Sequence, residues 1–498
     1  MKNKILHLDE KDNVVVALDI LYKGDKISFA GSNIVIKEDI KTGHKIAIKD
    51  ISKDEKIIKF GQVIGKAAEE ISSGSLVHTH NIVTNLADYE EYVYTQLKIE
   101  QKVNSQIPNF MGYRRKNGKV GIRNEIWIIN TVGCVNTSAE RIAKLCNERL
   151  KRNNFDGVYS FSHPYGCSQL GDDLQNTKKV LEGLINNPNA GGILVMGLGC
   201  ENLQLRSLMD TINLFDKDRI IYFNSQEVND EIETGITSIT KIFENMKNDK
   251  RELCPVSDLI VGMKCGGSDS FSGITANPLV GRISDKLAGY GASILLTEVP
   301  EMFGAEQQLL NRAKNKQIYQ SIIDLINNFK KYFIDHNKPI YENPSPGNKD
   351  GGISTLEEKS LGAIQKGGTT IINDVLEYGQ QIREKGLSLL NAPGNDGVSS
   401  TAMVVSGATL LLFTTGRGTP LGFPVPTLKI SSNSELYEKK RNWIDFDAGV
   451  LVSGDKNIQQ LTDELFDFII KVASGEIKTK NEINGNREIS IWKTGVTL

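Results

Sequence analysis

Mostly apolar segments, each followed by a glycine-containing turn and then a helix-like stretch, recur along the chain from residue 125 onward. Residues 125–131, 192–196 and 410–415 are examples of such segments. Strands that are apolar on both faces are typical of parallel sheets, because helices cover both sides of such sheets. The sequence therefore predicts an α/β fold with mainly parallel sheets.

The N-terminal part of the chain has a different pattern of apolar and polar residues. Short apolar segments such as residues 14–18 and 44–48 are separated by Gly, Asp and Lys turns, a pattern typical of a small β-rich domain. A chain of 498 residues is also too long for one ordinary core. We expect a β-rich domain at residues 1–98, a polar linker at 98–109, a second α/β domain at 110–250 and a C-terminal α/β domain at 255–498.

Charge and hydropathy narrow the classes of partner. The 59 basic side chains nearly balance the 61 acidic ones, so nothing favours nucleic acid or an anionic membrane. The first residues lack the apolar stretch of a signal peptide, and residues 401–415 are too short and too polar to span a bilayer. We predict a cytoplasmic protein that acts on a small molecule, with no nucleic-acid or membrane partner. The formation of a homo-oligomer is a further possibility.

The six cysteines form no C-x-x-C pair, which argues against a zinc ribbon or a thioredoxin-type motif. Cys146 lies in a helix-like stretch and is most simply a core residue. The other five include four that each follow an apolar strand: Cys134, Cys167, Cys200 and Cys265. Ligands of open α/β sheets bind at the carboxyl ends of strands, so these thiols could converge on a metal such as iron. The alternative is that each thiol only fills space in the core.

The glycine-rich stretch at residues 264–278 contains an ammonium group, a thiol, a carboxylate and several hydroxyl groups. Lys264, Cys265, Ser268 and Asp269 lie within six positions, between an apolar strand and a helix-like run. Its glycines allow a tight turn and close approach to a ligand. We interpret it as a functional loop; a purely structural, well hydrogen-bonded loop is the alternative.

Two histidines close the β-rich region. His78 and His80 are two positions apart, so on a strand both rings would face the same side and could ligate a metal or supply a base. The alternative is a surface strand with two unrelated histidines.

Three other loops carry charges. Glu298, Glu301 and Glu306 follow a predicted strand and could ligate a metal or transfer protons, or simply complement a helix N-terminus. Arg417 and Arg123 could each bind a carboxylate, although Arg123 could equally pin the start of a strand.

Common cofactor motifs are missing. Residues 197–202 begin like a dinucleotide-binding fingerprint, but Asn202 replaces the third glycine and would obstruct close helix–strand packing. The chain also lacks a Walker A sequence, H-E-x-x-H and G-x-S-x-G. A nicotinamide-linked oxidoreductase is therefore disfavoured.

Several long motifs, in order, resemble the altronate/galactarate dehydratase family from end to end. They include Tyr165-Gly-Cys-Ser-Gln-Leu-Gly-Asp-Asp173, Cys265-Gly-Gly-Ser-Asp269 and residues 77–81, 120–124, 131–136, 197–202, 272–278, 297–306, 343–348, 392–396 and 443–447. The resemblance implies an N-terminal SAF-type β-clip domain followed by two α/β regions. It also implies dehydration of D-altronate to 2-dehydro-3-deoxy-D-gluconate in uronate breakdown, dependent on Fe²⁺ or Mn²⁺; galactarate dehydratases resemble the chain less.

On this basis we assign roles as a hypothesis. A base removes the C2 proton, an acid helps the C3 hydroxyl depart, and a metal stabilises the developing charge. The candidates are His163, Lys264 and Glu298 for proton transfer; Asn81, Arg123, Asn124, Ser268, Asp269 and Arg417 for substrate binding; and His78, His80, Cys167, Cys200 and Cys265 for the metal. Histidine and cysteine ligation stay alternatives, as do a mononuclear iron and an iron–sulfur cluster. A non-catalytic sugar-acid-binding protein is the alternative of another class.

Overall fold

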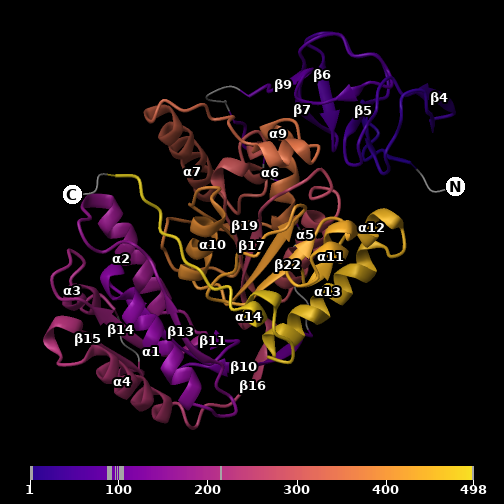
Figure 1. The fold of residues 1–498 in the computed structure, drawn as a ribbon. Helices are drawn as coiled ribbons and strands as arrows, with labels where there is room; N and C mark the ends of the chain where they lie inside the picture. Colours follow the sequence, from indigo (N-terminus) through magenta and orange to yellow (C-terminus); the bar gives the residue numbers. More distant parts are fainter. Residues whose placement is uncertain are drawn as a thin grey trace.

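The computed structural model describes residues 4–86, 92–95, 97, 99, 106–212 and 216–495. Figure 1 shows three regions: an indigo β-rich module, a magenta α/β region and an orange-to-yellow α/β region. The predicted fold class is confirmed. The predicted linker at residues 98–109 lies mostly outside the described residues.

The N-terminal module consists of short antiparallel strands in small sheets. One sheet has the order β1-β2-β5-β8, a second has the order β6-β7-β9, and β3 pairs with β4. Successive residues of a strand point to opposite faces: Val14 joins the core shared with the C-terminal region, and Val15 joins the core internal to the module. The strands are β1 (Ile5–Leu6), β2 (Val14–Ala17), β3 (Lys26–Phe29), β4 (Ser32–Val35), β5 (Lys45–Ala47), β6 (Lys56–Lys59), β7 (Gln62–Ala67), β8 (Leu76–Val77) and β9 (Ile82–Val83).

A buried ion cluster attaches this module to the C-terminal region. The Glu358 carboxylate accepts hydrogen bonds from the ammonium groups of Lys45 and Lys59, each at 2.8 Å, and all three side chains are buried. Lys45 also donates to Ser354 Oγ and to the Gly352 carbonyl oxygen. Burial lowers the pKa of Lys45 to about 8 despite the attraction of Glu358. The N-terminal module therefore supplies two buried ammonium groups and the C-terminal region supplies the carboxylate that neutralises them.

The second region contains a parallel sheet with the strand order β13-β12-β14-β15. Every residue of β12 is buried. Ile126 and Ile128 pack against α1 and α4, while Trp127 and Ile129 pack against α2 on the other face. The elements are β12 (Glu125–Asn130), α1 (Asn136–Arg149), β13 (Gly157–Phe161), α2 (Gly171–Ile185), β14 (Ala190–Gly197), α3 (Leu205–Met209), β15 (Ile220–Asn224) and α4 (Glu231–Asn245).

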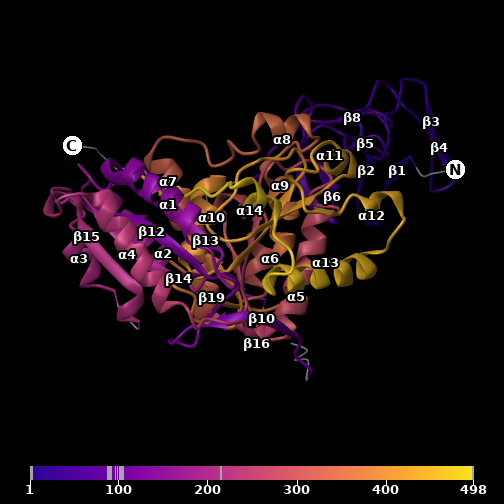
Figure 2. The same cartoon turned by 60° about the horizontal axis from the view of Figure 1, so that its bottom comes forward.

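A small antiparallel sheet joins this region to the next. It has the order β11-β10-β16, from β10 (Asn109–Arg114), β11 (Val120–Gly121) and β16 (Glu252–Pro255). Figure 2 shows it at the lower edge of the molecule.

The C-terminal region is built on a seven-stranded parallel sheet with the order β19-β20-β18-β17-β21-β22-β23. Helices α5 and α13 cover one face, and α10 covers the other, where it also packs against α2. The strands are β17 (Ile260–Cys265), β18 (Ser293–Leu296), β19 (Ile372–Leu376), β20 (Gly386–Leu390), β21 (Leu410–Thr415), β22 (Thr427–Ser431) and β23 (Phe446–Asp447). The helices are α5 (Ala276–Gly289), α6 (Glu306–Leu310), α7 (Lys316–Asp335), α8 (Pro346–Asp350), α9 (Leu356–Ala363), α10 (Asp396–Val405), α11 (Ser434–Lys439), α12 (Val450–Ser453), α13 (Ile458–Ala473) and α14 (Lys480–Asn484).

Among the described residues, no helix combines the length and the apolar character needed to cross a membrane.

Candidate functional site

A cavity of about 640 Å³ opens at the carboxyl ends of β17, β18 and β20. Its lining includes Cys265, Glu301, Asn348, Lys359 and Asp396. These residues come from separate parts of the chain. Cys265, Glu301 and Asp396 meet because the parallel strands before them end at the same edge of the sheet. Helices α8 and α9 carry Asn348 and Lys359.

A thiol and two carboxylates meet at the wall of this cavity, where Cys265 and Glu301 line it. Cys265 is the last residue of β17, and Glu298 and Glu301 follow β18. The Cys265 thiol lies 3.1 Å from Glu301 Oε2 and 3.7 Å from Glu298 Oε2. Glu298 has a left-handed backbone conformation with a φ of 71°, which is uncommon for a non-glycine residue and costs free energy. The backbone thus turns the Glu298 side chain toward Cys265.

Three lysines surround this acidic group. Lys366 Nζ lies 2.9 Å from Cys265 Sγ and 3.4 Å from Glu298 Oε2. Lys359 pairs with Glu301 at 2.9 Å, and Lys264 forms an ion pair with Glu298. Lys264 and Lys366 are fully buried, so the low local dielectric strengthens all of these contacts.

The charges shift the proton affinities of the cluster in different directions. Burial would raise the pKa of Glu301, but the ammonium groups of Lys359, Lys366 and Lys264 outweigh it and lower the pKa to about 2. Burial and the adjacent Glu298 and Glu301 carboxylates raise the pKa of the Cys265 thiol to about 12. The site therefore holds an ionised Glu301 next to a thiol that keeps its proton.

Asp396 connects the buried cluster with the cavity. It is the first residue of α10, and its Oδ1 lies 2.9 Å from Lys264 Nζ. Lys264 thus bridges Asp396 to Glu298, and only Asp396 of these three lines the cavity. About 35% of its side chain is exposed, so this carboxylate can reach a bound molecule.

Of the glycine-rich loop, Ser268 lines the cavity described above, whereas Asp269 lines a different cleft. Ser268 lines the cavity, and its carbonyl oxygen accepts a hydrogen bond from Asn348. The Asp269 carboxylate accepts hydrogen bonds from Ser272, Ser432 and Asn433, which fix the loop. Asp269 instead lines a separate cleft of about 1380 Å³, which it shares with the exposed Arg417.

His78 and His80 do not lie on one strand. Strand β8 ends at Val77 and β9 begins at Ile82, so the two histidines occupy the turn between them. The prediction that a strand aligns their rings is wrong, because the Asn81 side chain accepts a hydrogen bond from the His78 amide and closes the turn. His78 lies 3.0 Å from Ser354 Oγ, and burial lowers its pKa to about 4; His80 is exposed.

His163 has both ring nitrogens occupied. Its Nε2 lies 2.8 Å from the Asn130 carbonyl oxygen, and its Nδ1 accepts a hydrogen bond from the Tyr165 amide. This pattern fixes one neutral tautomer, and burial lowers the pKa of the ring. In this arrangement His163 supports the loop after β13.

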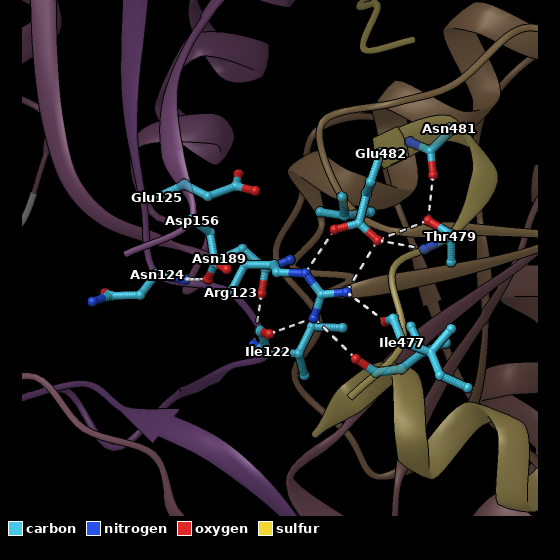
Figure 3. A network of polar contacts seen from close by, with 12 residues as sticks. Ile122, Arg123, Asn124, Glu125, Asp156, Asn189, Ile477, Thr479, Asn481 and Glu482 are labelled. Atoms are coloured by element: carbon cyan, nitrogen blue, oxygen red, sulfur yellow. Dashed lines mark hydrogen bonds and ion pairs between the residues drawn. The ribbon is translucent and has the colours of Figure 1, made fainter. Parts of the chain in front are cut away.

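Arg123 lies in a buried network that connects the second region to α14 (Figure 3). Its guanidinium forms a two-pronged pair with Glu482, at 2.7 and 3.0 Å, and also donates to three backbone carbonyl oxygens. The adjacent Asn124 accepts a hydrogen bond from Arg115 and donates one to the Asn154 carbonyl oxygen. Both side chains have structural partners and neither lines the cavity.

An Arg123→Met variant is expected to lose stability and keep substrate affinity. Removing the cation leaves Glu482 buried without its main partner, which costs about 3–5 kcal/mol. Urea unfolding would measure the stability, and the substrate KM would measure binding. An Arg441→Met variant, which breaks an exposed pair with Glu438, is the control. A strongly raised KM at unchanged stability would instead support the predicted role of Arg123 in substrate binding.

The predicted metal ligands lie in separate parts of the structure. Cys265 belongs to the buried cluster, whereas Cys167 and Cys200 lie exposed at the edge of the second sheet. Among the described residues, the only three ligand atoms within 4.8 Å of one another belong to Cys265, Glu298 and Glu301.

Three residues of the site receive no role in the hypothesis drawn from the sequence. Asp396 lies in the motif at residues 392–396, which could have suggested it. Lys359 and Lys366 lie on and just after α9, about a hundred positions from Cys265, with no motif around them. Only the fold brings these two lysines to the site.

Models of three domains match consecutive parts of the chain. The altronate/galactarate dehydratase SAF domain matches residues 3–85, the second domain of D-galactarate dehydratase/altronate hydrolase matches 112–247, and the C-terminal domain of D-galactarate/altronate dehydratase matches 256–497. Together these matches span all three regions of the fold.

Curated relatives match over almost the whole length. The chain is 49% identical over 494 residues to altronate dehydratase of Bacillus subtilis (strain 168), covering 99% of both chains. It is 48% identical over 491 residues to altronate dehydratase of Escherichia coli (strain K12), covering 98% of both. It is 35% identical over 461 residues to galactarate dehydratase (L-threo-forming) of Escherichia coli (strain K12), covering 89% of this chain and 87% of that one.

Proposed function

The chain belongs to the D-galactarate/altronate dehydratase family, and from this premise we propose that it is a hydro-lyase that converts D-altronate to 2-dehydro-3-deoxy-D-gluconate and water. The relatives named altronate dehydratase are 49% and 48% identical to it, against 35% for the galactarate dehydratase. This difference favours the aldonate over the aldarate as substrate.

The observation that carries the reaction type is the group of three lysines beside the Cys265–Glu298–Glu301 cluster. Removing the proton on C2 of a hydroxy acid places negative charge on the adjacent carboxylate, which makes that proton hard to remove. Ammonium groups that are already fixed in a buried site stabilise such a charge without reorganising. Lys359 lines the cavity, and we assign it to the substrate carboxylate.

We assign the proton transfers to Asp396 and Cys265, which both line the cavity. Asp396 takes the C2 proton as the C3–O bond breaks, and the Cys265 thiol protonates the departing hydroxyl to give water. Lys366, 2.9 Å from the sulfur, stabilises the thiolate that forms. Return of the Asp396 proton to C3, and of the enol proton to Cys265, yields the 2-keto acid and restores both groups. Lys264 and Glu298 position Asp396.

The implied metal does not fit the Cys265–Glu298–Glu301 group. A thiolate and two carboxylates are suitable iron ligands. Here, however, Lys366 contacts the sulfur, and all three lysines pair with the two carboxylates. A divalent cation would have to displace these ammonium groups or lie directly against them, at a large electrostatic cost. The steps above therefore use side chains alone.

An assay for 2-keto acid tests the proposal. Protein purified without oxygen would be offered D-altronate and galactarate separately, and we expect product from D-altronate at a much higher kcat/KM. Faster turnover of galactarate would keep the reaction and overturn the substrate. Binding of D-altronate without any product would instead support a non-catalytic sugar-acid-binding protein.

A reducing compartment suits the thiols of the site. All six cysteines are free, as is usual for proteins of such compartments. This supports the predicted cytoplasmic location.

A further inference from the structure

Three thiols lie at the carboxyl edge of the second sheet, and we propose that Cys134, Cys167 and Cys200 together hold an iron–sulfur cluster. Each follows one of three adjacent parallel strands, in the order β13-β12-β14. The strands end nearly level, because Ile129 pairs with Phe161 and Asn130 pairs with Met196. All three thiols are free and their residues exposed. The inference stands whether or not D-altronate is the substrate.

The loops that carry the thiols are joined to one another. The Gly133 amide donates to the Tyr165 carbonyl oxygen, and the Leu203 amide donates to the Gly166 carbonyl oxygen. The Ser168 amide donates to Asn202 Oδ1 at 2.7 Å. Each of these residues lies within three positions of one of the cysteines, so the loops hold the three cysteines in fixed relative positions.

Unusual backbone conformations bring these loops close. Gly166 has a φ of 98°, and a Cβ there would lie 1.9 Å from the Thr131 carbonyl oxygen, so only glycine fits. Ser168 has a φ of 56°, a conformation that costs a non-glycine residue free energy. Glu201 further ties the loops by accepting hydrogen bonds from Thr131 and from the Leu198 and Gly199 amides. The strain at Ser168 is of the kind that clusters at functional sites.

The thiols have little packing role. The Cys167 sulfur lies 3.7 Å from Ser168 Oγ, and the Cys200 sulfur lies 3.6 Å from Gln226 Nε2. By contrast, Cys146, Cys254 and Cys265 are buried. Three exposed thiols on adjacent strand ends are therefore better explained by a shared ligand than by core packing.

The donor set suits an iron–sulfur cluster, because cysteine thiolates hold such clusters. Among the described residues, these three sulfurs are not within 4.8 Å of one another, as the ligands of one ion would be. In a cluster each thiolate binds a different iron, so the sulfurs lie farther apart. Three thiolates on a four-iron cluster would leave one iron open to an oxygen ligand.

Iron and acid-labile sulfide measured on protein purified without oxygen test this inference. We expect both in the native protein, together with the visible absorbance of iron–sulfur bonds. The single variants Cys134→Ser, Cys167→Ser and Cys200→Ser and the triple variant are expected to lose most of the iron, sulfide and colour while circular dichroism stays unchanged. Cys146→Ala, in α1 of the same region, is the matched control and should keep all three signals.

Other outcomes would overturn the cluster. They are native protein without iron and sulfide, iron without sulfide, or a triple variant that keeps both. A loss of both in Cys265→Ser alone would also place the cluster elsewhere. Asp396→Asn separates this inference from the proposed function, since that variant should lose turnover while it keeps its iron and sulfide.

Discussion

Replacing Asp396 by Asn is expected to lower kcat by about 10²–10⁴-fold, the usual contribution of a general base. The amide keeps the size of the side chain and cannot accept the C2 proton. Because Lys359 lies elsewhere on the cavity wall, the substrate KM should change far less than kcat. Steady-state kinetics with D-altronate would measure both quantities.

The control for this variant is Asp335→Asn, which changes an exposed carboxylate at the end of α7. It should leave kcat and KM unchanged. Asp396 pairs with the fully buried Lys264, so the unfolding midpoint of each variant must be compared with that of the native protein. A folded Asp396→Asn protein with native kcat would remove Asp396 from the mechanism and return the role of base to Glu298.

Replacing Glu358 by Gln is expected to cost about 3–5 kcal/mol of stability, because two buried ammonium groups then lose their common counter-charge. The effect should concentrate on the contact between the N-terminal module and α9. Hydrogen exchange should therefore accelerate in strands β5 and β6, which carry Lys45 and Lys59, more than in the second sheet. Glu55→Gln, which breaks an exposed pair with Lys49, is the matched control.

The same contact predicts how stability depends on pH. Burial would raise the pKa of Glu358, but Lys45 and Lys59 outweigh it and lower the pKa to about 2. An unfolded Glu has a pKa of about 4.3, so the unfolded chain takes up a proton first as the pH falls. The stabilisation is complete above that value and is lost as the pH falls toward about 2. Glu358→Gln should flatten this part of the stability curve; an unchanged curve would contradict the assignment.

Much of the fold could be predicted from the sequence. The apolar strands at residues 125–131 and 410–415 indicated parallel sheets, and the structure places them in β12 and β21. The motifs indicated the family, which the comparisons confirm, including a SAF domain at residues 3–85. Strand and domain type follow from local patterns of apolar side chains, so the sequence carries this information directly.

The candidate site was predictable only in part. Lys264, Cys265 and Glu298 lie at strand ends that carry several ionisable or polar side chains within a few positions. The structure brings the three together. Arg123 and His163 carry equally suggestive side chains, but Glu482 and the Asn130 carbonyl oxygen occupy their polar atoms. Whether a polar side chain is free or already satisfied depends on partners far away along the chain, which a single sequence does not specify.

The sequence by itself determined the α/β class, the β-rich N-terminal domain and the placement of four cysteines after strands. Only the tertiary structure decided that Cys265 lies among buried lysines while Cys134, Cys167 and Cys200 lie exposed after adjacent strands of another sheet. The physical reason is the distance along the chain over which each kind of interaction acts. Periodicity and turn chemistry act over a few residues, whereas Lys366 reaches Cys265 across about a hundred positions because β17, β18 and α9 pack together.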